Sequence, residues 1–522
     1  MIDSSKKRYR FRMVIPAYPA FNIYSGVART MTALGPVCVA SIVNKMENWD
    51  VEVIDENNFR RFAPRNESGG VDHEFLQELR PADVVGLYGG LTSTIPRLYE
   101  IARFYKEKGV LTIAGGQHFV DETIPEALRS FLDYIVIGEG EETIKELLCA
   151  LKEKDDVCQV KGIVYLKDGL VRRTPAREPI TDFEKLPLPD FSLVRYAKIN
   201  VYPVERIRGC GMDCEFCTVK GKPRPASPER LLESISFLVE TMDARHFFIV
   251  DDLFGQQRAE TLRFCQMLEN YQKHTVRLDV FAQIRLDKAK DSELLTAMRK
   301  AGINTVAIGF ESPIKEELEA MNKHIKPEDM IALARIFHKF GFLVHGMFIF
   351  GYPIKGESKF VMPIAERIKR FRTFIQKARI DTIQVLLATP LPGTELRQRL
   401  QEKNRVYSTA DIGWQYYDGN FPLFEPDGPL TAQEMQVASR KIMGGFYQFK
   451  HLFAIALNAL SFPGIIFFLH NIKLGWKRWY RPWRNALARF GGWMIMSRWM
   501  KEFKKSPFMD SLKKAQKHLK RK

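Results

Sequence analysis

The chain has 522 residues, 45% hydrophobic and 27% charged, so it is long enough for two or three domains with substantial cores. This composition excludes a disordered chain and a fully membrane-embedded one. The net charge of +17 is unevenly placed, because residues 471–522 contain sixteen Lys or Arg against two acids. The basic character therefore belongs to the C-terminal tenth of the chain and needs its own explanation.

Cysteine usage and the N-terminal residues indicate a reducing compartment. Residues 1–21 lack the apolar core and small-residue cleavage site of a secretory signal, so we expect a cytoplasmic protein. The chain has seven cysteines, an odd number, and three of them lie within residues 210–217. Such a cluster is more typical of metal binding than of a disulfide framework.

Residues 1–150 are predicted to form a doubly wound, Rossmann-like α/β domain, because five short apolar runs alternate with amphipathic helical patterns. Three of these runs end in glycine pairs: Gly89 and Gly90, Gly115 and Gly116, and Gly138 with Gly140. The pairs are compatible with ordinary tight turns. Their shared place at the carboxyl edge of a parallel sheet favours a cofactor crevice, where glycine lets the backbone approach a ligand.

Residues 151–200 are expected to be a linker with a hairpin at Asp168-Gly169 and a proline-rich end. Residues 201–405 then repeat the strand–helix alternation six times, with the first strand expected at residues 204–209. Six units predict a partial (β/α)6 barrel that is open on one side. In barrels of parallel strands the chemistry lies at the carboxyl ends of the strands.

The first barrel strand leads into Cys210, Cys214 and Cys217, spaced four and then three residues apart. Thiolates at this spacing can each bind a separate iron of a cubane cluster, and three ligands leave the fourth iron open to a substrate. The alternative is a structural zinc site. That site needs a fourth Cys or His, and the sequence has none nearby at zinc-type spacing.

The CxxxCxxC spacing, with an aromatic residue before the last cysteine, resembles the radical SAM superfamily over residues 200–400. The resemblance implies a [4Fe–4S] cluster whose open iron binds S-adenosyl-L-methionine (SAM). It also implies reductive cleavage of SAM to a 5′-deoxyadenosyl radical, with an electron donor such as flavodoxin or ferredoxin. The SAM contacts that it implies are Phe216, Asp251, Glu311 and Ser312. We interpret Asp252 as a solvated strand end or a cap.

The N-terminal segment resembles the cobalamin-binding subclass of this superfamily. The cobalamin contacts that this implies are Gly89, Thr92, Ser93, Gly115, Gly116, His118, Gly138, Glu139 and Gly140. The subclass's histidine motif DxHxxG is absent, and Asp72-His73 does not match it, so we expect no histidine below the cobalt. The alternative is a domain that keeps the fold without cobalamin, since the first loop, PAYPAFNIYSG, is bulky for a corrin site.

Residues 406–522 are expected to be helical. Residues 451–469 are almost entirely apolar but are broken by Pro463-Gly464, and five of the seven tryptophans follow among basic residues. This pattern favours peripheral contact with the inner face of a membrane. Two alternatives are packing against the open side of the barrel and nucleic-acid binding, and we expect no nucleic-acid partner.

The function predicted from these features is methylation of an unactivated carbon in a hydrophobic substrate, such as a lipid, terpenoid or tetrapyrrole. The alternative is radical C–C coupling or ring formation on a lipid without cobalamin. An RNA methylthiotransferase is disfavoured. A resemblance to that class would imply three cysteines in the N-terminal domain, and residues 1–150 contain only Cys38 and Cys149. The catalytic residues are not assigned. Tyr416 and Tyr417 are acid–base candidates only through their position after the barrel.

Overall fold

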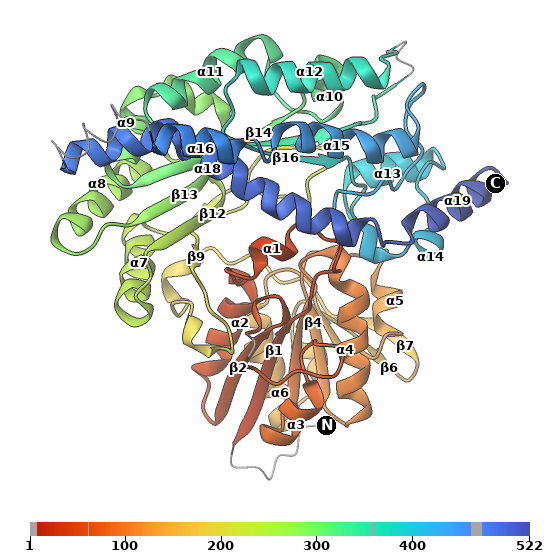
Figure 1. The fold of residues 1–522 in the computed structure, drawn as a ribbon. Helices are drawn as coiled ribbons and strands as arrows, with labels where there is room; N and C mark the ends of the chain where they lie inside the picture. The colour runs from red at the N-terminus through yellow and green to blue at the C-terminus, as the bar shows by residue number, and fades with distance from the viewer. Residues whose placement is uncertain (1–7, 61, 357–359, 461–471, 522) are drawn as a thin grey trace.

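The computed structural model describes residues 8–60, 62–356, 360–460 and 472–521, without the side chains of residues 458, 459 and 472–482. Two α/β units, each built on its own sheet, lie one against the other (Figure 1). The break at Pro463-Gly464 and the side chains of Trp476 and Trp479 lie outside the described residues. Among the described helices, none combines the length and apolar character needed to cross a membrane.

The first sheet has eight strands in the order β7-β6-β5-β4-β3-β1-β2-β8. Its strands are β1 Tyr9–Ile15, β2 Trp49–Asp55, β3 Val84–Tyr88, β4 Leu111–Gly115, β5 Tyr134–Val136, β6 Ile163–Lys167, β7 Leu170–Arg173 and β8 Val194–Arg195. Its helices are α1 Ser25–Ala28, α2 Leu34–Asn44, α3 His73–Leu79, α4 Ile95–Glu107, α5 Ile124–Leu128 and α6 Glu141–Glu153. The strands from β1 to β5 run parallel, which confirms the doubly wound fold.

β1 pairs with both β2 and β3, so the order of the first five strands reverses at β1. A doubly wound sheet binds ligands at such a switch point, beyond the carboxyl ends of its strands. β3, β4 and β5 end next to the three glycine pairs. The predicted cofactor residues therefore share one edge of the sheet.

The segment predicted as a linker belongs largely to the first sheet. β6 and β7 form the expected hairpin, with Lys167 opposite Leu170 and positive φ at Asp168 and Gly169. β6 pairs antiparallel with β5, and β8 adds to the other edge beside β2. The proline-rich sequence correctly indicated where this segment ends. That its strands join the first sheet was not predicted, because their partners β5 and β2 lie far away in the chain.

The second sheet has six parallel strands in the order β16-β15-β14-β13-β12-β9, which confirms the open barrel. Its strands are β9 Val201–Val204, β12 His246–Phe254, β13 Asp279–Ile284, β14 Ile303–Glu311, β15 Leu343–Phe350 and β16 Thr382–Leu387. Its helices are α7 Pro228–Met242, α8 Arg258–His274, α9 Ser292–Lys300, α10 Lys315–Ala320, α11 Pro327–Lys339, α12 Ile364–Lys377 and α13 Glu395–Glu402.

The first barrel strand lies earlier than predicted. β9 ends at Val204, and the next extended pair, β10 (Ile207–Arg208), instead pairs antiparallel with β11 (Arg224–Pro225). The cause is Asp251, whose carboxylate accepts hydrogen bonds from the amides of Arg206 and Ile207 and so ends the ladder. The β10–β11 ribbon closes the base of the loop that contains the three cysteines.

The C-terminal helices are α14 Thr409–Ile412, α15 Ala432–Phe446, α16 His451–Ala459, α18 Ile472–Phe503 and α19 Phe508–Leu519. One side of α18 and of α19 packs against the rest of the molecule. Arg489 donates to the carbonyl of Ile380 at 3.0 Å, and the Trp499 indole donates to the carbonyl of Phe21 at 2.6 Å. Phe508 and Leu512 are buried. Internal packing, one of the two alternatives for the tail, therefore applies to residues 489–519.

Candidate functional site

Alternate residues of the barrel strands face the inside of the half-barrel. On β12, Phe247, Ile249 and Asp251 are buried toward the helices, whereas Phe248, Val250 and Asp252 are partly exposed on the inner face. Part of the inner face is apolar, with the stacked rings of Phe248 and Phe281 and the side chains of Met347, Ile349 and Leu386, and polar side chains such as Gln283, His345 and Gln384 share the same inward parity. A partly exposed apolar concave face suits an apolar substrate.

The three cysteines of the loop after β10 are partly buried and lie within electrostatic reach of one another. Burial is the main cause that raises the pKa of each thiol. In the described part of the chain, no three Cys, His, Asp or Glu side chains converge as the ligands of a single metal ion do. A cubane cluster does not require that convergence, because its cysteines bind separate irons.

The two aspartates at the end of β12 anchor the start of this loop. Asp251 is buried on the outer side and accepts from the Arg206 amide at 2.6 Å, and burial raises its pKa to about 7. Asp252 faces inward and accepts from the Gly209 amide at 2.8 Å. Strand alternation therefore turns Asp251, the predicted SAM contact, away from the interior, and Asp252 occupies the inner position.

Glu311 and Ser312, the two SAM contacts predicted at the end of β14, have different surroundings. The Glu311 carboxylate lies over Gly309 and accepts from Lys323 at 2.7 Å, on the cysteine side of the barrel. Ser312 is fully buried and donates to Glu317, so its hydroxyl serves the start of α10 rather than the interior. Ser312, the other SAM contact predicted here, is thus engaged with α10 in this structure. Phe216 packs edge-on against Tyr352, with ring centroids 6.2 Å apart.

Glu215, between the second and third cysteines, clamps the loop to the barrel. Its side chain is 2% exposed, and its carboxylate accepts from Arg399 at 2.6 and 3.0 Å and from the Tyr352 hydroxyl at 2.6 Å. Its amide donates to the carbonyl of Met321 at 3.1 Å. Sequence analysis missed this residue, because its partners lie far away in the chain.

We expect Glu215→Ala to loosen the loop, because it leaves the partly buried Arg399 guanidinium without its anion, a change that costs on the order of a few kcal/mol. The measurement is the rate of iron loss to a chelator after anaerobic cluster reconstitution, which should rise well above that of the wild type. Glu395→Gln is the matched control, since Glu395 pairs with Lys220 of the same loop at the surface. Equal iron loss in Glu215→Ala and the wild type, with unchanged thermal unfolding, would contradict the clamp.

The carboxyl edge of the first sheet borders a cavity of about 260 Å³. Its lining includes five of the predicted cobalamin residues: Gly115, Gly116, Gly138, Glu139 and Gly140. Gly116 has φ +130°, and a Cβ placed there would lie 2.5 Å from the carbonyl carbon of Gly89. Only glycine therefore lets the turns after β3 and β4 approach each other this closely.

The other predicted cobalamin residues lie at the same edge but do not line this cavity. Thr92 and Ser93 are buried. His118 is 1% exposed, with Nδ1 3.3 Å from Thr92 and its ring edge-on to Trp414. Burial, with a smaller contribution from Arg397, lowers the pKa of His118 to about 3, so the imidazole is neutral. Gly89 contacts Phe119.

Loops of the first domain contact the cysteine loop directly. Thr218, next to Cys217, donates to Gln117 at 3.1 Å. Glu139 forms ion pairs with Arg208 at 3.1 Å and with Arg224 at 2.8 Å, on either side of the loop. Burial opposes the charge of Glu139, but hydrogen bonds from Arg224 and the Ile180 amide lower its pKa overall. These contacts place the two predicted cofactor regions side by side.

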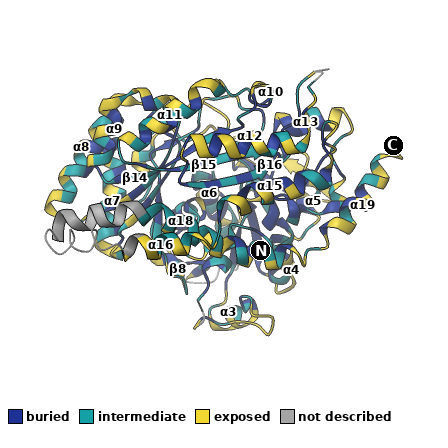
Figure 2. Cartoon of the chain, turned by 45° about the horizontal axis from the view of Figure 1, so that its top comes forward, coloured by how far each residue is buried: buried dark blue, intermediate teal, exposed yellow. Residues whose placement is uncertain are grey.

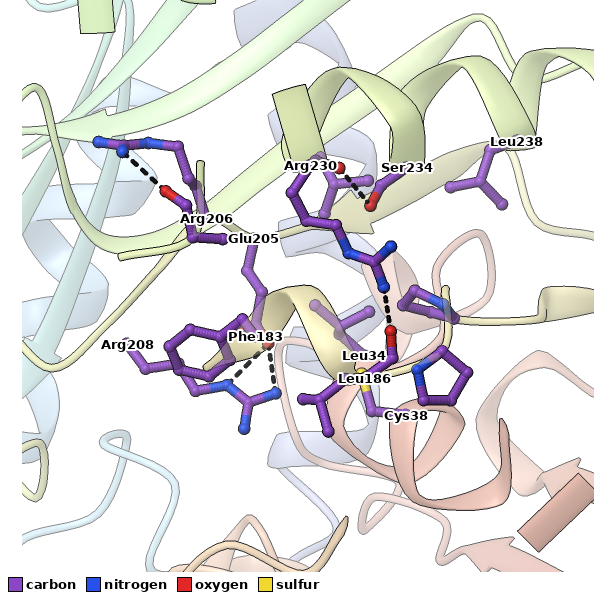
Figure 3. A pocket seen from close by; sticks show the side chains of 14 residues that line it. Leu34, Cys38, Phe183, Leu186, Glu205, Arg206, Arg208, Arg230, Ser234 and Leu238 are labelled. Carbon is purple, nitrogen blue, oxygen red and sulfur yellow. Dashed lines mark hydrogen bonds and ion pairs between the residues drawn. The ribbon is translucent and has the colours of Figure 1, made fainter. Parts of the chain in front are cut away.

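Arg208 is the centre of this junction. It also pairs with Glu141 at 2.7 Å. Figure 3 shows its pair with Glu205, at 2.6 Å, beside Phe183, whose ring centroid lies 5.1 Å from the guanidinium. A second cavity of about 60 Å³ lies here beside Cys38. It is too small for a cofactor. Arg208 has no signature in the sequence, because its partners come from three separate segments.

The first loop contacts the barrel. Gln384, on the inner face of β16, donates to the Tyr24 hydroxyl, and the ring of Phe21 stacks on Tyr416 with centroids 5.1 Å apart. This packing explains the bulk of the loop. Tyr416 is buried in an aromatic cluster, and the Tyr417 hydroxyl accepts from Arg397 at 3.2 Å. Both tyrosines therefore serve packing, which removes them as acid–base candidates.

Comparison with protein families matches residues 204–362 to the radical SAM superfamily. The chain is 27% identical over 438 residues to an uncharacterized methyltransferase of Pyrococcus horikoshii, covering 81% of this chain and 89% of the relative. It is 25% identical to the hopanoid C-2 methylase of Rhodopseudomonas palustris, covering 77% and 72%. It is 27% identical to the anaerobic magnesium-protoporphyrin IX monomethyl ester cyclase of Rubrivivax gelatinosus, covering 68% and 64%.

Two solved structures share the fold. One is OxsB, a cobalamin-dependent SAM radical enzyme solved with aqua-cobalamin and SAM, with TM-score 0.64, 16% identity, and coverage of 98% of this chain and 84% of that one. The other is the radical SAM methyltransferase TsrM from Kitasatospora setae, with TM-score 0.58, 18% identity, and coverage of 76% and 78%. The likeness extends over both sheets of this chain.

Proposed function

Since the chain belongs to the radical SAM superfamily and has the two-sheet fold of its cobalamin-dependent members, we propose that it is a cobalamin-dependent radical SAM methyltransferase. The observation that carries the proposal is the direct contact between the two cofactor regions, through Thr218 and Gln117 and through Arg208 and Glu139. An enzyme that uses both cofactors on one substrate carbon must hold them next to each other.

The residues present fit these cofactors. Cys210, Cys214 and Cys217 would hold the [4Fe–4S] cluster, and Asp252 and Glu311 face the interior where SAM would bind its open iron. The glycine edge and the 260 Å³ cavity beside it would hold cobalamin. When bound, SAM would supply the adenosyl radical and cobalamin the methyl group.

We place a hydrophobic substrate, such as a lipid, terpenoid or tetrapyrrole, against the inner face of the half-barrel. The support is the apolar inner face around Phe248 and Phe281, together with the relatives named for hopanoid and protoporphyrin substrates. The first domain covers this face through Tyr24, which restricts water at the reacting carbon. The proposal includes a one-electron donor and peripheral contact with a membrane.

Methyl transfer is tested with SAM labelled in its methyl group. Enzyme reconstituted with cluster and cobalamin, supplied with a lipid extract and a low-potential reductant, should incorporate label into an apolar product. 5′-Deoxyadenosine and S-adenosylhomocysteine should form in equal amounts, because one SAM is consumed as the radical source and another as the methyl donor. Incorporation of label without any 5′-deoxyadenosine would contradict the radical step.

The second candidate is radical ring formation, favoured by the resemblance to a monomethyl ester cyclase. The same experiment separates the two reactions. Ring closure would yield 5′-deoxyadenosine without transferred label, and the product would lose two hydrogens instead of gaining a methylene. Either outcome leaves the cluster assignment intact, because both reactions begin with SAM cleavage.

A further inference from the structure

One helix near the C-terminus exposes an apolar face. Phe449, Phe453, Leu457 and Leu460 are spaced by four, four and three residues, and are 45%, 62%, 74% and 75% exposed. This spacing places them on one side of α16 and its flanking turns, here called the α16 face. Exposed positions along α16 are yellow in Figure 2. Large apolar side chains gathered on one exposed face indicate an interaction surface.

α16 is anchored along α18. Phe449, at one end of the α16 face, itself packs on α18 with its ring 5.0 Å from that of Trp493, and His451 Nε2 lies 3.1 Å from the carbonyl of Phe446. The α16 face is therefore displayed by a helix with a fixed position in the fold.

Charge identifies the partner. Residues 451–472 contain no Asp, Glu, Lys or Arg, and sixteen Lys or Arg follow against two acids. Lys450 is exposed at the start of α16, and the first half of α18, the helix that lies along α16, has five basic residues in its sequence: Lys473, Lys477, Arg478, Arg481 and Arg484. Apolar residues bordered by positive charge match the interface of an anionic bilayer. A second copy of the chain would bring two strongly basic tails together, which disfavours self-association through this face.

The position of α16 suits access to the barrel. α18 passes from the last barrel strand, where Arg489 donates to the Ile380 carbonyl, to the first loop, where Trp499 donates to the Phe21 carbonyl. α18 thus lies along the open side of the half-barrel, with α16 beside it (Figure 1). A membrane in contact with α16 would lie next to this open side.

We propose that the α16 face inserts into the interface of an anionic membrane, with the neighbouring Lys and Arg on lipid headgroups. The inference gives the proposed hydrophobic substrate a route of entry, and to that extent it rests on the proposed function. Docking itself requires neither cluster nor cobalamin.

The test is co-sedimentation of the full chain with phosphatidylglycerol–phosphatidylcholine vesicles and with phosphatidylcholine vesicles. The wild type should bind the anionic vesicles more tightly, and high salt should weaken this binding only in part. The variant Phe453→Ser/Leu457→Ser/Leu460→Ser should bind roughly a hundredfold more weakly, because three apolar side chains no longer enter the interface.

The matched control is Phe62→Ser/Leu79→Ser/Leu170→Ser, which removes three side chains that are 78%, 56% and 58% exposed on the first domain. It should bind vesicles like the wild type. Unchanged vesicle binding by the α16 variant would overturn the proposal. The proposal would also be overturned if the wild type formed a dimer, the α16 variant were a monomer, and both bound vesicles equally. Since the assay uses the chain without cofactors, a failure to bind vesicles would not affect the proposed methyl transfer. A failure of methyl transfer would likewise not affect the proposed vesicle binding.

Discussion

Replacing Cys210, Cys214 or Cys217 with Ala is expected to abolish both the visible absorption of the cluster and the release of 5′-deoxyadenosine under reductant. Each thiolate would bind a separate iron, so the loss of one leaves a second iron without a protein ligand. The effect should be complete in each single variant. The measurement is absorption after anaerobic reconstitution, followed by chromatography of the nucleosides formed from SAM.

Two cysteines outside the loop serve as controls. Cys265 is buried among barrel helices, and Cys158 is exposed on the first domain. Cys265→Ala and Cys158→Ala should keep both the absorption and SAM cleavage, although Cys265→Ala removes a small buried side chain. If any single loop variant still cleaved SAM at the wild-type rate, the cluster assignment would be wrong.

The second large effect is expected at Gly116. Gly116→Ala should lower the affinity for cobalamin by on the order of tenfold or more, because the new Cβ would meet the backbone of Gly89 and push the two strand-end loops apart. The measurement is cobalamin retained after reconstitution and desalting, read from its absorption. The cluster should still assemble in this variant, because Gly116 lies outside the cysteine loop.

Gly109→Ala separates this effect from general glycine strain. Gly109 also has positive φ, +74°, but a Cβ there meets nothing within 4 Å. The control should therefore lose some stability, about 1 kcal/mol, yet retain cobalamin. Equal retention by Gly116→Ala and the wild type would show that the glycine edge does not hold the cofactor.

The sequence predicted the fold where a local pattern was sufficient. Alternation of apolar runs with helical patterns predicted both parallel sheets, and the glycine pairs predicted the shared edge, because parallel strands end on the same side. The same alternation could have separated Asp251 from Asp252. Phe248, Val250 and Asp252 have one parity on β12, and only the structure showed which parity faces inward.

The features that the sequence did not reveal depend on distant contacts. Glu215 acts through Arg399, and Arg208 joins acids from two domains, so neither has a local signature. Composition alone could not separate the packed residues of the C-terminal region from its exposed ones. Trp499 is buried against the first loop although α18 is rich in basic residues, whereas Leu457 is exposed on the more apolar α16. Tertiary packing separates these two, and the local sequence does not.

We propose that this one chain holds an iron–sulfur cluster and a cobalamin side by side. The decisive measurement is the absorption spectrum of the protein after anaerobic reconstitution with iron, sulfide and cobalamin and removal of unbound cofactor. We expect corrin bands at one cobalamin per chain above the broad cluster absorption. We also expect a Co(II) electron paramagnetic resonance signal without the nitrogen splitting of an axial histidine, unchanged in His118→Ala. A cluster spectrum with no retained corrin would rule out the cobalamin site and favour radical chemistry without cobalamin.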